Sequence, residues 1–201
     1  MEHALSADDA PSLILASTSA YRRELLARLR LPFECLPPGC DEARLPDEPA
    51  LALVQRLARL KAEAVATHRP GSVVIGSDQV ALRGTEILGK PGTVERCTEQ
   101  LRRSSGQELA FLTAVHVVDT RHGRAESHLD RTIVRFRELS AAEISRYIAA
   151  DSPLDCAGGF KAEALGIALF ERIESNDPTA LTGLPMIWVS AALRRAGIPV
   201  P

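Results

Sequence analysis

The chain has 201 residues, with 24 Lys and Arg against 26 Asp and Glu, and this near balance of charge gives no support to a broad nucleic-acid surface. A hydrophobic fraction of 45% and a charged fraction of 25% are typical of globular proteins and exclude disordered and fibrous classes. No stretch approaches the roughly 20 apolar residues of a membrane span, and the first residues lack a signal-peptide pattern, so we expect a cytoplasmic protein. Four dispersed cysteines without a Cys-x-x-Cys pair indicate reduced thiols rather than a zinc site.

Strands and helices are predicted to alternate after a polar leader at 1–12. The apolar run 13–16 predicts a buried strand, and hydroxyl residues then cap a helix over 21–29. The later elements are, in chain order, a helix with an apolar face of Leu51, Val54, Leu57, Ala58, Ala62 and Val65, a strand at 73–78, a helix at 94–103, a hairpin of strands at 109–118 and 128–136, a capped helix at 141–150 and a last helix from Pro185 to Gly197. This order predicts a mixed α/β fold in one domain, 13–201, with a cleft between two lobes.

Hydroxyl groups and arginines follow the first predicted strand closely. Ser17-Thr18-Ser19 precedes a helix whose first turn holds Arg22 and Arg23. A helix N-terminus favours anions, and an arginine can bind two phosphate oxygens at once, so this segment is suited to a phosphate. The alternative is an ordinary N-cap at Ser19 with solvated arginines.

Two carboxylates are candidates for metal binding or for activation of water. Asp78 ends an apolar run at the point where a parallel strand would leave the sheet, which is where α/β proteins place ligands. Glu42 lies in an acidic turn. Their oxygens could hold a divalent cation, although an aspartate after a strand is also a common turn former.

Three further charged residues complete the candidate set. Lys61 lies on or beside the apolar stripe of the second helix, where it either reaches a ligand or extends its ammonium to solvent. Lys90 sits on the stiff turn Gly89-Lys90-Pro91, suited to a polyphosphate or simply exposed. Glu163 follows a glycine loop and offers acceptors to a base, or is a surface carboxylate. Cations, paired carboxylates and a base-sized acceptor together favour a nucleotide ligand.

Several short motifs occur in order along the chain. They are Leu-Ala-Ser-Thr-Ser-x-x-Arg-Arg at 15–23, Asp41-Glu42, Arg56-Leu57-Ala58-x-x-Lys61-Ala62, Ile75-Gly76-Ser77-Asp78-Gln79-Val80, Gly89-Lys90-Pro91, Cys156-Ala157-Gly158 and Gly183-Leu184-Pro185. Through these motifs, over about 13–199, the chain resembles the Maf-type nucleoside triphosphate pyrophosphatases.

The resemblance implies a house-cleaning hydrolase that splits a nucleoside triphosphate into the monophosphate and diphosphate with a divalent cation, Mg²⁺ or Mn²⁺. It also implies the mixed α/β fold shared with inosine triphosphate pyrophosphatases, an elongated mixed sheet with flanking helices. The implied partners are a nucleotide substrate and a second copy of the chain in a homodimer, with no nucleic acid and no membrane.

Within that family the chain resembles the branch of 7-methyl-GTP pyrophosphatases. The triplet Ser77-Asp78-Gln79 differs from the Ser-Asp-Thr of the branch that resembles dTTP/UTP pyrophosphatases. An ionised Glu163 can accept from the N1–H and 2-amino donors of a guanine, and an aromatic face attracts the positive charge of an N7-methylated base. The chain departs from the branch at Ala20-Tyr21, where Pro-Trp is typical, and at Asp155, where a His is more usual and to which we assign no role.

Carried onto this sequence, the resemblance implies a role for each matching residue. Asp78 would accept the proton of the attacking water, and Glu42 and Asp78 would hold the metal. The residues implied to bind the triphosphate are Ser17, Ser19, Arg22, Lys61 and Lys90, and those implied to set base specificity are Tyr21, Gln79 and Glu163.

Three other functions remain as alternatives. A pyrophosphatase for dTTP, UTP or other noncanonical nucleotides is disfavoured by Gln79 and Glu163. A septum-formation regulator that acts only by binding would not need the set of Glu42, Lys61, Asp78 and Lys90 together. An RNA-binding module is disfavoured by the 4% aromatic content and the negative net charge.

Overall fold

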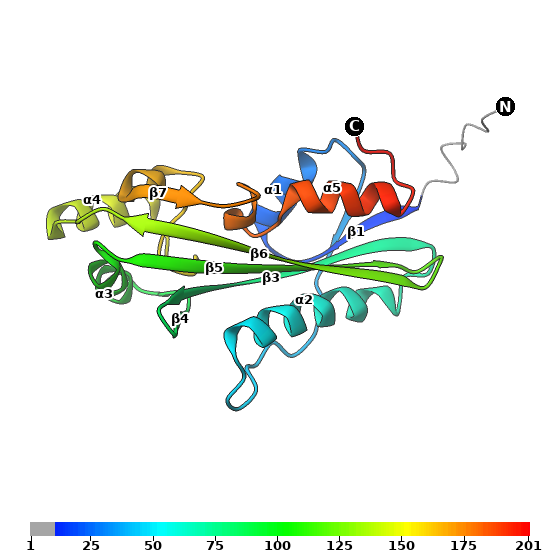
Figure 1. The fold of residues 1–201 in the computed structure, drawn as a ribbon, viewed down its shortest axis with the longest axis horizontal. Helices are drawn as coiled ribbons and strands as arrows, with labels where there is room; N and C mark the ends of the chain where they lie inside the picture. The colour runs from blue at the N-terminus through cyan, green and yellow to red at the C-terminus, as the bar shows by residue number, and fades with distance from the viewer. Residues whose placement is uncertain (1–10) are drawn as a thin grey trace.

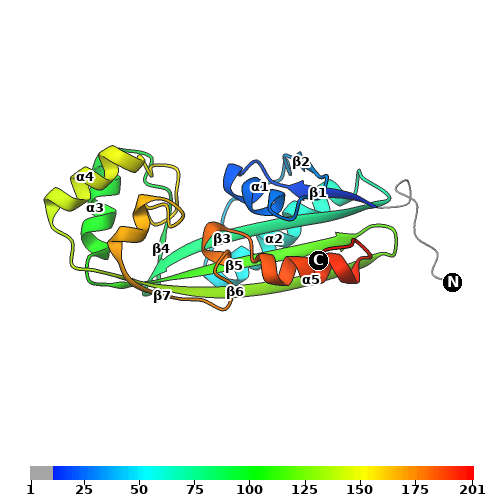
Figure 2. The ribbon, with the colours of Figure 1, turned by 90° about the horizontal axis from the view of Figure 1, so that it is seen from above.

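The computed structural model describes residues 11–201, and a seven-stranded mixed sheet runs along its length (Figures 1 and 2). The strand order is β2-β1-β3-β5-β6-β7, with β4 paired to β3. Strand β3 pairs parallel with β1 on one side and antiparallel with β5 on the other, and β5 pairs antiparallel with β6. The strands are β1 Ser12–Ala16, β2 Glu34–Leu36, β3 Ser72–Arg83, β4 Glu86–Leu88, β5 Glu108–Asp119, β6 Arg124–Phe136 and β7 Phe170–Glu174.

Helices cover both faces of the sheet at one end, and two further helices pack against its other end. The long helix α2 lies under one face, α1 and α5 lie on the opposite face, and α3 and α4 lie together at the far end (Figures 1 and 2). The helices are α1 Ala20–Ala27, α2 Ala50–Ala66, α3 Val94–Ser104, α4 Ala141–Asp151 and α5 Met186–Arg195, with 3-10 helices η1 Leu165–Leu169 and η2 Ala180–Thr182. Within the described residues, no helix has the length and apolarity needed to cross a membrane.

The apolar runs of β1 and β3 are explained by this double cover. Leu13 and Leu15 pack with α1 and α5, whereas Ile14 and Ala16 pack with α2. Strands with both faces covered read as continuous apolar runs rather than as alternating ones. A separate core lies around Phe136, between α3, α4 and the ends of β5 and β6. We call this part of the molecule the second lobe, and the part that contains β1, α1 and α5 the first lobe.

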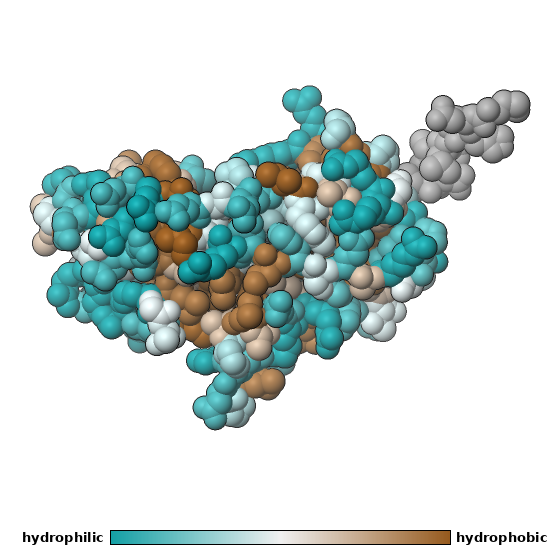
Figure 3. Space-filling view, in the orientation of Figure 1, coloured by the Kyte–Doolittle hydropathy of each residue, from teal (hydrophilic) through white to brown (hydrophobic). Residues whose placement is uncertain are grey.

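Strands β3, β5 and β6 are longer than the typical strand and extend through both lobes. Strands β3 and β5 therefore contribute side chains to both cores: Ile75 of β3 belongs to the core of the first lobe and Ala81 to that of the second. Both ends of the molecule are mainly hydrophilic, and apolar side chains gather near the middle of the face in Figure 3. The cleft lies where the two lobes meet.

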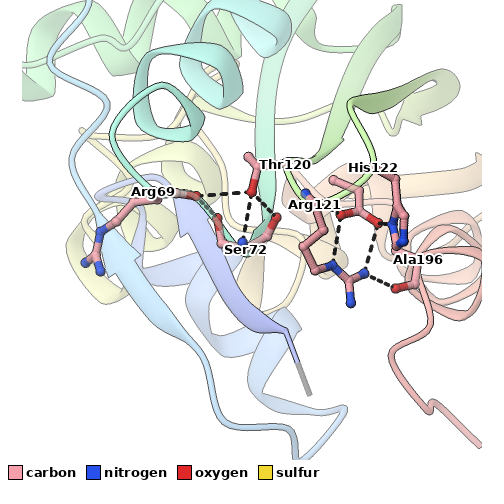
Figure 4. Close-up of polar contacts among 7 residues, drawn as sticks. Arg69, Ser72, Thr120, Arg121, His122 and Ala196 are labelled. Carbon is pink, nitrogen blue, oxygen red and sulfur yellow. Dashed lines mark hydrogen bonds and ion pairs between the residues drawn. The ribbon is translucent and has the colours of Figure 1, made fainter. Parts of the chain in front are cut away.

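The sheet tip furthest from the α3 and α4 lobe is closed by a polar cluster (Figure 4). The buried Asp119 accepts from the backbone N–H, Nε and Nη2 of Arg121 and pairs with Nδ1 of His122 at 2.9 Å. Arg121 also donates to the carbonyl of Ala196, just after α5. Burial raises the pKa of Asp119, but the hydrogen bonds from Arg121 and His122 outweigh it and hold that pKa well below its usual range. The β5–β6 turn is thereby joined to the end of α5.

Most of the predicted elements are confirmed. The hairpin of β5 and β6, the helices α3, α4 and α5 and the N-cap at Ser19 occur where the sequence predicts them. The short strands β2, β4 and β7 were not predicted. The predicted leader at 1–12 lies outside the described residues as far as residue 10, and Ser12 is already part of β1.

One prediction about the core of α2 is wrong. The sequence pattern predicts Leu51 on the apolar face, but Leu51 is 46% exposed, and Leu53 is buried in its place. Both residues lie in the first turn of α2, where the period of the apolar stripe can be continued through either one. The other predicted residues of this face are buried: Val54, Leu57, Ala58, Ala62 and Val65.

Candidate active site

A cleft of about 890 Å³ opens between the two lobes. It falls within the size range of small-ligand sites, and a nucleotide fits such a volume. Its walls come from the β1–α1 segment, α2, β3, the loop after β4 and the segment 155–163. All ten site residues that the sequence predicts line this cleft: Ser17, Ser19, Tyr21, Arg22, Glu42, Lys61, Asp78, Gln79, Lys90 and Glu163.

Lys61 lies between two carboxylates at one side of the cleft. Its Nζ is 2.8 Å from Oδ1 of Asp78 and 2.6 Å from Oε2 of Glu42. The side chains of Lys61 and Asp78 are 7% and 12% exposed, whereas that of Glu42 is 51% exposed. The ammonium therefore compensates a nearly buried carboxylate and also reaches a second, solvated one, as a buried cation requires.

The close approach of α2 to β3 creates this arrangement. Gly76 lies two residues before Asp78 in β3, and a Cβ at this position would be 2.4 Å from the carbonyl oxygen of Ala58 and 2.5 Å from the amide of Ala62. Only glycine lets the helix backbone lie this close to the strand. Lys61, between these two helix positions, is thereby held against Asp78.

Two expectations about these residues need correction. Asp78 does not end its strand: β3 continues to Arg83, because residues 79–83 pair with β5 and β4. It does lie beyond the last register pair with β1, Leu15 with Ile75, so the parallel part of the sheet ends just before it. Lys61 does not extend to solvent, because two carboxylates bind its ammonium inside the cleft.

Arg22 fixes the loop that follows η2. Its Nη1 donates to the carbonyl of Ser77 at 2.7 Å, and its Nε donates to the carbonyl of Gly183 at 3.0 Å. The Ser77 hydroxyl donates to the same Gly183 carbonyl at 2.8 Å. Burial lowers the pKa of Arg22, and the nearby Asp78 and Glu42 act in the opposite direction. Arg22 is therefore not a solvated arginine, although Arg23 is exposed.

Gln79 is held by the segment that follows β7. Its Nε2 donates to Oγ1 of Thr113 at 2.8 Å and to the carbonyls of Ala180 and Leu181 at 2.9 and 3.0 Å. An amide with its nitrogen fixed in this way has a defined orientation. Gln79 thus joins β3 to η2 at the wall of the cleft.

The two serine hydroxyls before α1 form hydrogen bonds within their own segment and also lie at the cleft. The Ser19 side chain caps α1 by accepting from the Arg22 amide at 3.4 Å, and Oγ of Ser17 accepts from the Ser19 amide at 3.1 Å. Both residues also line the cleft. The N-cap interpretation and a contact with an anion at this helix N-terminus are therefore compatible.

Tyr21 of α1 faces the other lobe across the cleft. Its hydroxyl lies 3.5 Å from Sγ of Cys156, and that thiol lies 3.5 Å from Oδ1 of Asp155. Burial raises the pKa of Tyr21, and the neighbouring Cys156, Asp155 and Glu163 add to the effect. Burial also raises the pKa of the Cys156 thiol to about 11, so this cysteine stays protonated at neutral pH. All four cysteines are free, as the sequence predicts.

Lys90 and Glu163 reach the cleft from exposed segments of the second lobe. The amide of Gly92 donates to the carbonyl of Leu154 at 2.9 Å, which holds the Lys90 loop beside the segment that carries Asp155. Both side chains are exposed, so each is free to meet a ligand or solvent. Their proposed contacts with phosphate and base remain predictions.

The donors in the cleft fit a divalent cation that arrives with a phosphate ligand. Among residues 11–201, no group of three His, Cys, Asp or Glu side chains could hold a metal alone. Mg²⁺ is often bound by one or two carboxylates, with substrate phosphates and water completing its shell. Glu42 and Asp78, joined through one ammonium, supply this pair of carboxylates.

Several residues that shape the cleft were not selected from the sequence. Ser77 and Thr113 lie inside apolar strands, where a buried hydroxyl is the only signal of a required hydrogen bond. Asp177 accepts from the amides of Thr179 and Ile187 and so fixes the segment before α5. Gly183 has φ of 111°, a region that favours glycine, and an added Cβ would be 3.2 Å from Nε of Arg22.

The fold and this cleft define an α/β protein with charged side chains lining a cleft between two lobes. The chain belongs to the Maf-like protein family, whose pattern matches residues 12–196. This is the family that the ordered motifs indicate.

Two similar proteins carry the same name. A protein of Alkalilimnicola ehrlichii named 7-methyl-GTP pyrophosphatase is 53% identical over 190 residues, covering 94% of this chain and 96% of the relative. A protein of the same name from Xanthomonas campestris pv. campestris is 54% identical over 191 residues, covering 95% and 99%. Among solved structures, a HAM1 protein from Coxiella burnetii aligns with 92% of this chain and all of its own, at 13% identity and a TM-score of 0.47.

Proposed function

We propose that the chain is a nucleoside triphosphate pyrophosphatase that hydrolyses 7-methyl-GTP to 7-methyl-GMP and diphosphate. The observation that carries the proposal is the cleft in which Lys61 joins Glu42 and Asp78, in a chain about half identical to relatives with this activity in their name. An enzyme of this kind removes a modified nucleotide from the pool.

In this mechanism the side chains of the cleft bind the triphosphate, hold the reacting groups in position and accept a proton from water. Water attacks the α phosphorus: its oxygen bonds to that phosphorus, the bond from the α phosphorus to the α–β bridging oxygen breaks, and diphosphate leaves with the bridging oxygen. Asp78 accepts the proton of the water, and Lys61 holds the Asp78 carboxylate in place through Oδ1. Arg22, Lys90 and the Ser17 and Ser19 hydroxyls bind phosphate oxygens and stabilise the leaving charge.

A divalent cation, Mg²⁺ or Mn²⁺, would be held by Glu42 and Asp78 and would neutralise phosphate charge as the anhydride breaks. At the other end of the cleft, the Tyr21 ring would stack on the base and Glu163 would accept from N1–H and the 2-amino group. Gln79 would set base specificity by fixing the segment 180–181 that forms this wall.

The test is diphosphate release from 7-methyl-GTP, GTP, dTTP, UTP and CTP with Mg²⁺ or Mn²⁺, for the unchanged chain, Asp78→Asn and the control Asp47→Asn. Asp47 is exposed and lies outside the cleft, so its change removes the same charge elsewhere. We expect 7-methyl-GTP to be preferred and Asp78→Asn to lower kcat by about 100-fold or more, while Asp47→Asn has no effect. No diphosphate from any nucleotide would refute the activity, and a preference for dTTP or UTP would refute the substrate.

A further inference from the structure

Acidic side chains outnumber basic ones on the walls of the cleft. Five carboxylates line it against three cations, which is unexpected for a site that receives a polyanion. The acids are Glu24, Glu42, Asp78, Asp155 and Glu163, and the cations are Arg22, Lys61 and Lys90. A divalent cation held by Glu42 and Asp78 would account for two of these carboxylates, so the other three need an explanation beyond phosphate and metal binding.

Glu24 lies on α1, and the other four carboxylates form two groups by position. Glu42 and Asp78 share the ammonium of Lys61 on the side of the cleft formed by α2 and β3. Asp155 and Glu163 come from the segment after α4, on the opposite lobe, and their charges act on Tyr21. The nearest cation on that segment, Lys161, donates from Nζ to the carbonyl of Asp151 at 2.8 Å and is not part of the cleft wall.

A chain of contacts fixes Asp155 relative to the aromatic ring. Oδ1 of Asp155 is 3.5 Å from Sγ of Cys156, and the same sulfur is 3.5 Å from the hydroxyl of Tyr21. These contacts cross from the second lobe to α1 of the first. Asp155 is exposed, so its carboxylate can approach a ligand lying on the ring.

We propose that Asp155 makes the cleft select a purine base that carries a positive charge over the neutral form of the same base. This inference rests on the proposed function, in which the base lies against Tyr21. Methylation at N7 gives guanine a fixed positive charge, and a carboxylate near the ring attracts that charge but gains nothing from neutral guanine. Glu163 is already assigned to hydrogen-bond donors that both bases carry. Asp155 therefore adds a charge-based preference to the attraction that the face of Tyr21 has for a cationic base.

The measurement is the dissociation constant of 7-methyl-GMP and of GMP, made below neutral pH so that the methylated base keeps its N1 proton. Binding of these products is read without turnover and without added metal. Since the pair is partly solvated, we expect Asp155→Asn to reduce the preference for 7-methyl-GMP about three- to tenfold, chiefly by weakening 7-methyl-GMP. Asp155→Glu keeps the charge and should retain most of the preference, and Asp47→Asn should retain all of it.

The electrostatic cause gives a second readout. The preference of the unchanged chain should fall as salt is raised, and that of Asp155→Asn should depend on salt less. Equal weakening of both nucleotides in Asp155→Asn, or the same loss of preference in Cys156→Ala, would overturn the proposal, because Asp155 would then act by placing Tyr21. A chain that hydrolyses 7-methyl-GTP with the preference unchanged in Asp155→Asn would refute this inference alone, whereas a chain that binds and hydrolyses no nucleotide would refute the proposed function.

Discussion

Lys61 is a cation whose two partners, Glu42 and Asp78, are both acids of the proposed site. Lys61→Met keeps the aliphatic length of the side chain but removes the ammonium. The nearly buried Asp78 then loses its hydrogen bond, which we expect to cost about 1–3 kcal/mol of the free energy of unfolding. The loss of charge stabilisation should lower kcat/KM by about 100-fold or more.

Diphosphate release and urea unfolding check this prediction. The matched control is Arg59→Met, which removes an exposed cation from the same helix. Activity close to that of the unchanged chain in Lys61→Met would show that its ammonium serves only the fold.

Gln79 donates from one nitrogen to three oxygen acceptors, and this is the property that a carboxylate cannot replace. In Gln79→Glu an acceptor faces Thr113 and the carbonyls of Ala180 and Leu181. We expect this repulsion to destabilise the chain by about 1–3 kcal/mol and to raise KM, because the wall at 180–181 shifts. Urea unfolding and steady-state kinetics measure the two effects, with the exposed Gln55→Glu as the charge-matched control. If both variants unfold at the same urea concentration, the amide does not hold this segment.

Much of the candidate site could be selected from the sequence, because charged groups next to apolar runs and glycines are visible there. Lys61 and Asp78 were both selected, but their direct contact was not, since it depends on how α2 lies against β3. The partners of Arg22 and Gln79 are mostly backbone carbonyls. Every residue carries a carbonyl, so no residue type marks those positions in advance.

At the scale of elements, the contact between α2 and β3 depends on one missing methyl group. Gly76→Ala places a Cβ 2.4 Å from the carbonyl oxygen of Ala58 and 2.5 Å from the amide of Ala62, and both are backbone atoms that move only with the helix. We expect a loss of about 1–3 kcal/mol of stability and a matching loss of activity as Lys61 moves from Asp78.

Thermal unfolding and diphosphate release measure the effect of Gly76→Ala. Gly89→Ala is the control for stability, since nothing lies within 4 Å of its added Cβ. If Gly76→Ala unfolds at the same temperature as Gly89→Ala, α2 can move away from β3 without a loss of stability.

Helix α4 begins with a capping box that contains a titratable group, the carboxylate of Glu143. Ser140 accepts from the Glu143 amide, and Oε2 of Glu143 accepts from the amide and hydroxyl of Ser140, each at 2.8 Å. These bonds, with a smaller effect of Arg137, lower the pKa of Glu143 to about 2. A carboxylate with a lowered pKa stabilises the folded state above its ordinary pKa, and this stabilisation is lost as the pH falls through about 2.

Ser140→Ala should therefore lower Tm at neutral pH by about 2–4 °C, and the difference from the unchanged chain should shrink on acidification. Melting curves from neutral pH to acid measure this trend. Ser145→Ala, an exposed change within the same helix, should show no such pH dependence. A difference in Tm that stays constant down to the lowest pH would assign the effect to helix propensity instead.

The elements themselves were predictable where a local signal exists. The capping box at Ser140, the cap at Ser19 and the turn between β5 and β6 each have one. The strands that the sequence does not predict lack a local signal: β2 and β4 are three residues long. Similarly, β3 extends past Asp78 only because β5 and β4 lie beside it. Strand length in a sheet is set by the available partners, which a single segment does not reveal.

At the scale of the whole molecule, the cleft opens between two lobes whose cores lie on the same strands. Strands β3, β5 and β6 pass from one lobe to the other, and β5 and β6 pair along nearly their full length. Side chains of β3 and β5 belong to both cores. Loosening one core should therefore weaken the strand pairing that supports the other.

This coupling can be measured with the single tryptophan of the chain. Trp188 of α5 packs on the first core and stacks on His128 at 5.3 Å, whereas Phe136 is fully buried in the second core and contacts Phe160 and Phe170 edge to face. Phe136→Ala should cost about 3–5 kcal/mol, and the shared strands should carry this loss to the urea midpoint of Trp188 fluorescence. Far-UV circular dichroism should then give the same midpoint, because the lobes unfold together. The contrary result is an unchanged urea midpoint of Trp188 fluorescence together with a circular dichroism curve that splits into two steps. It would mean that each lobe folds on its own and that the cleft can open by local unfolding of the α3 and α4 lobe.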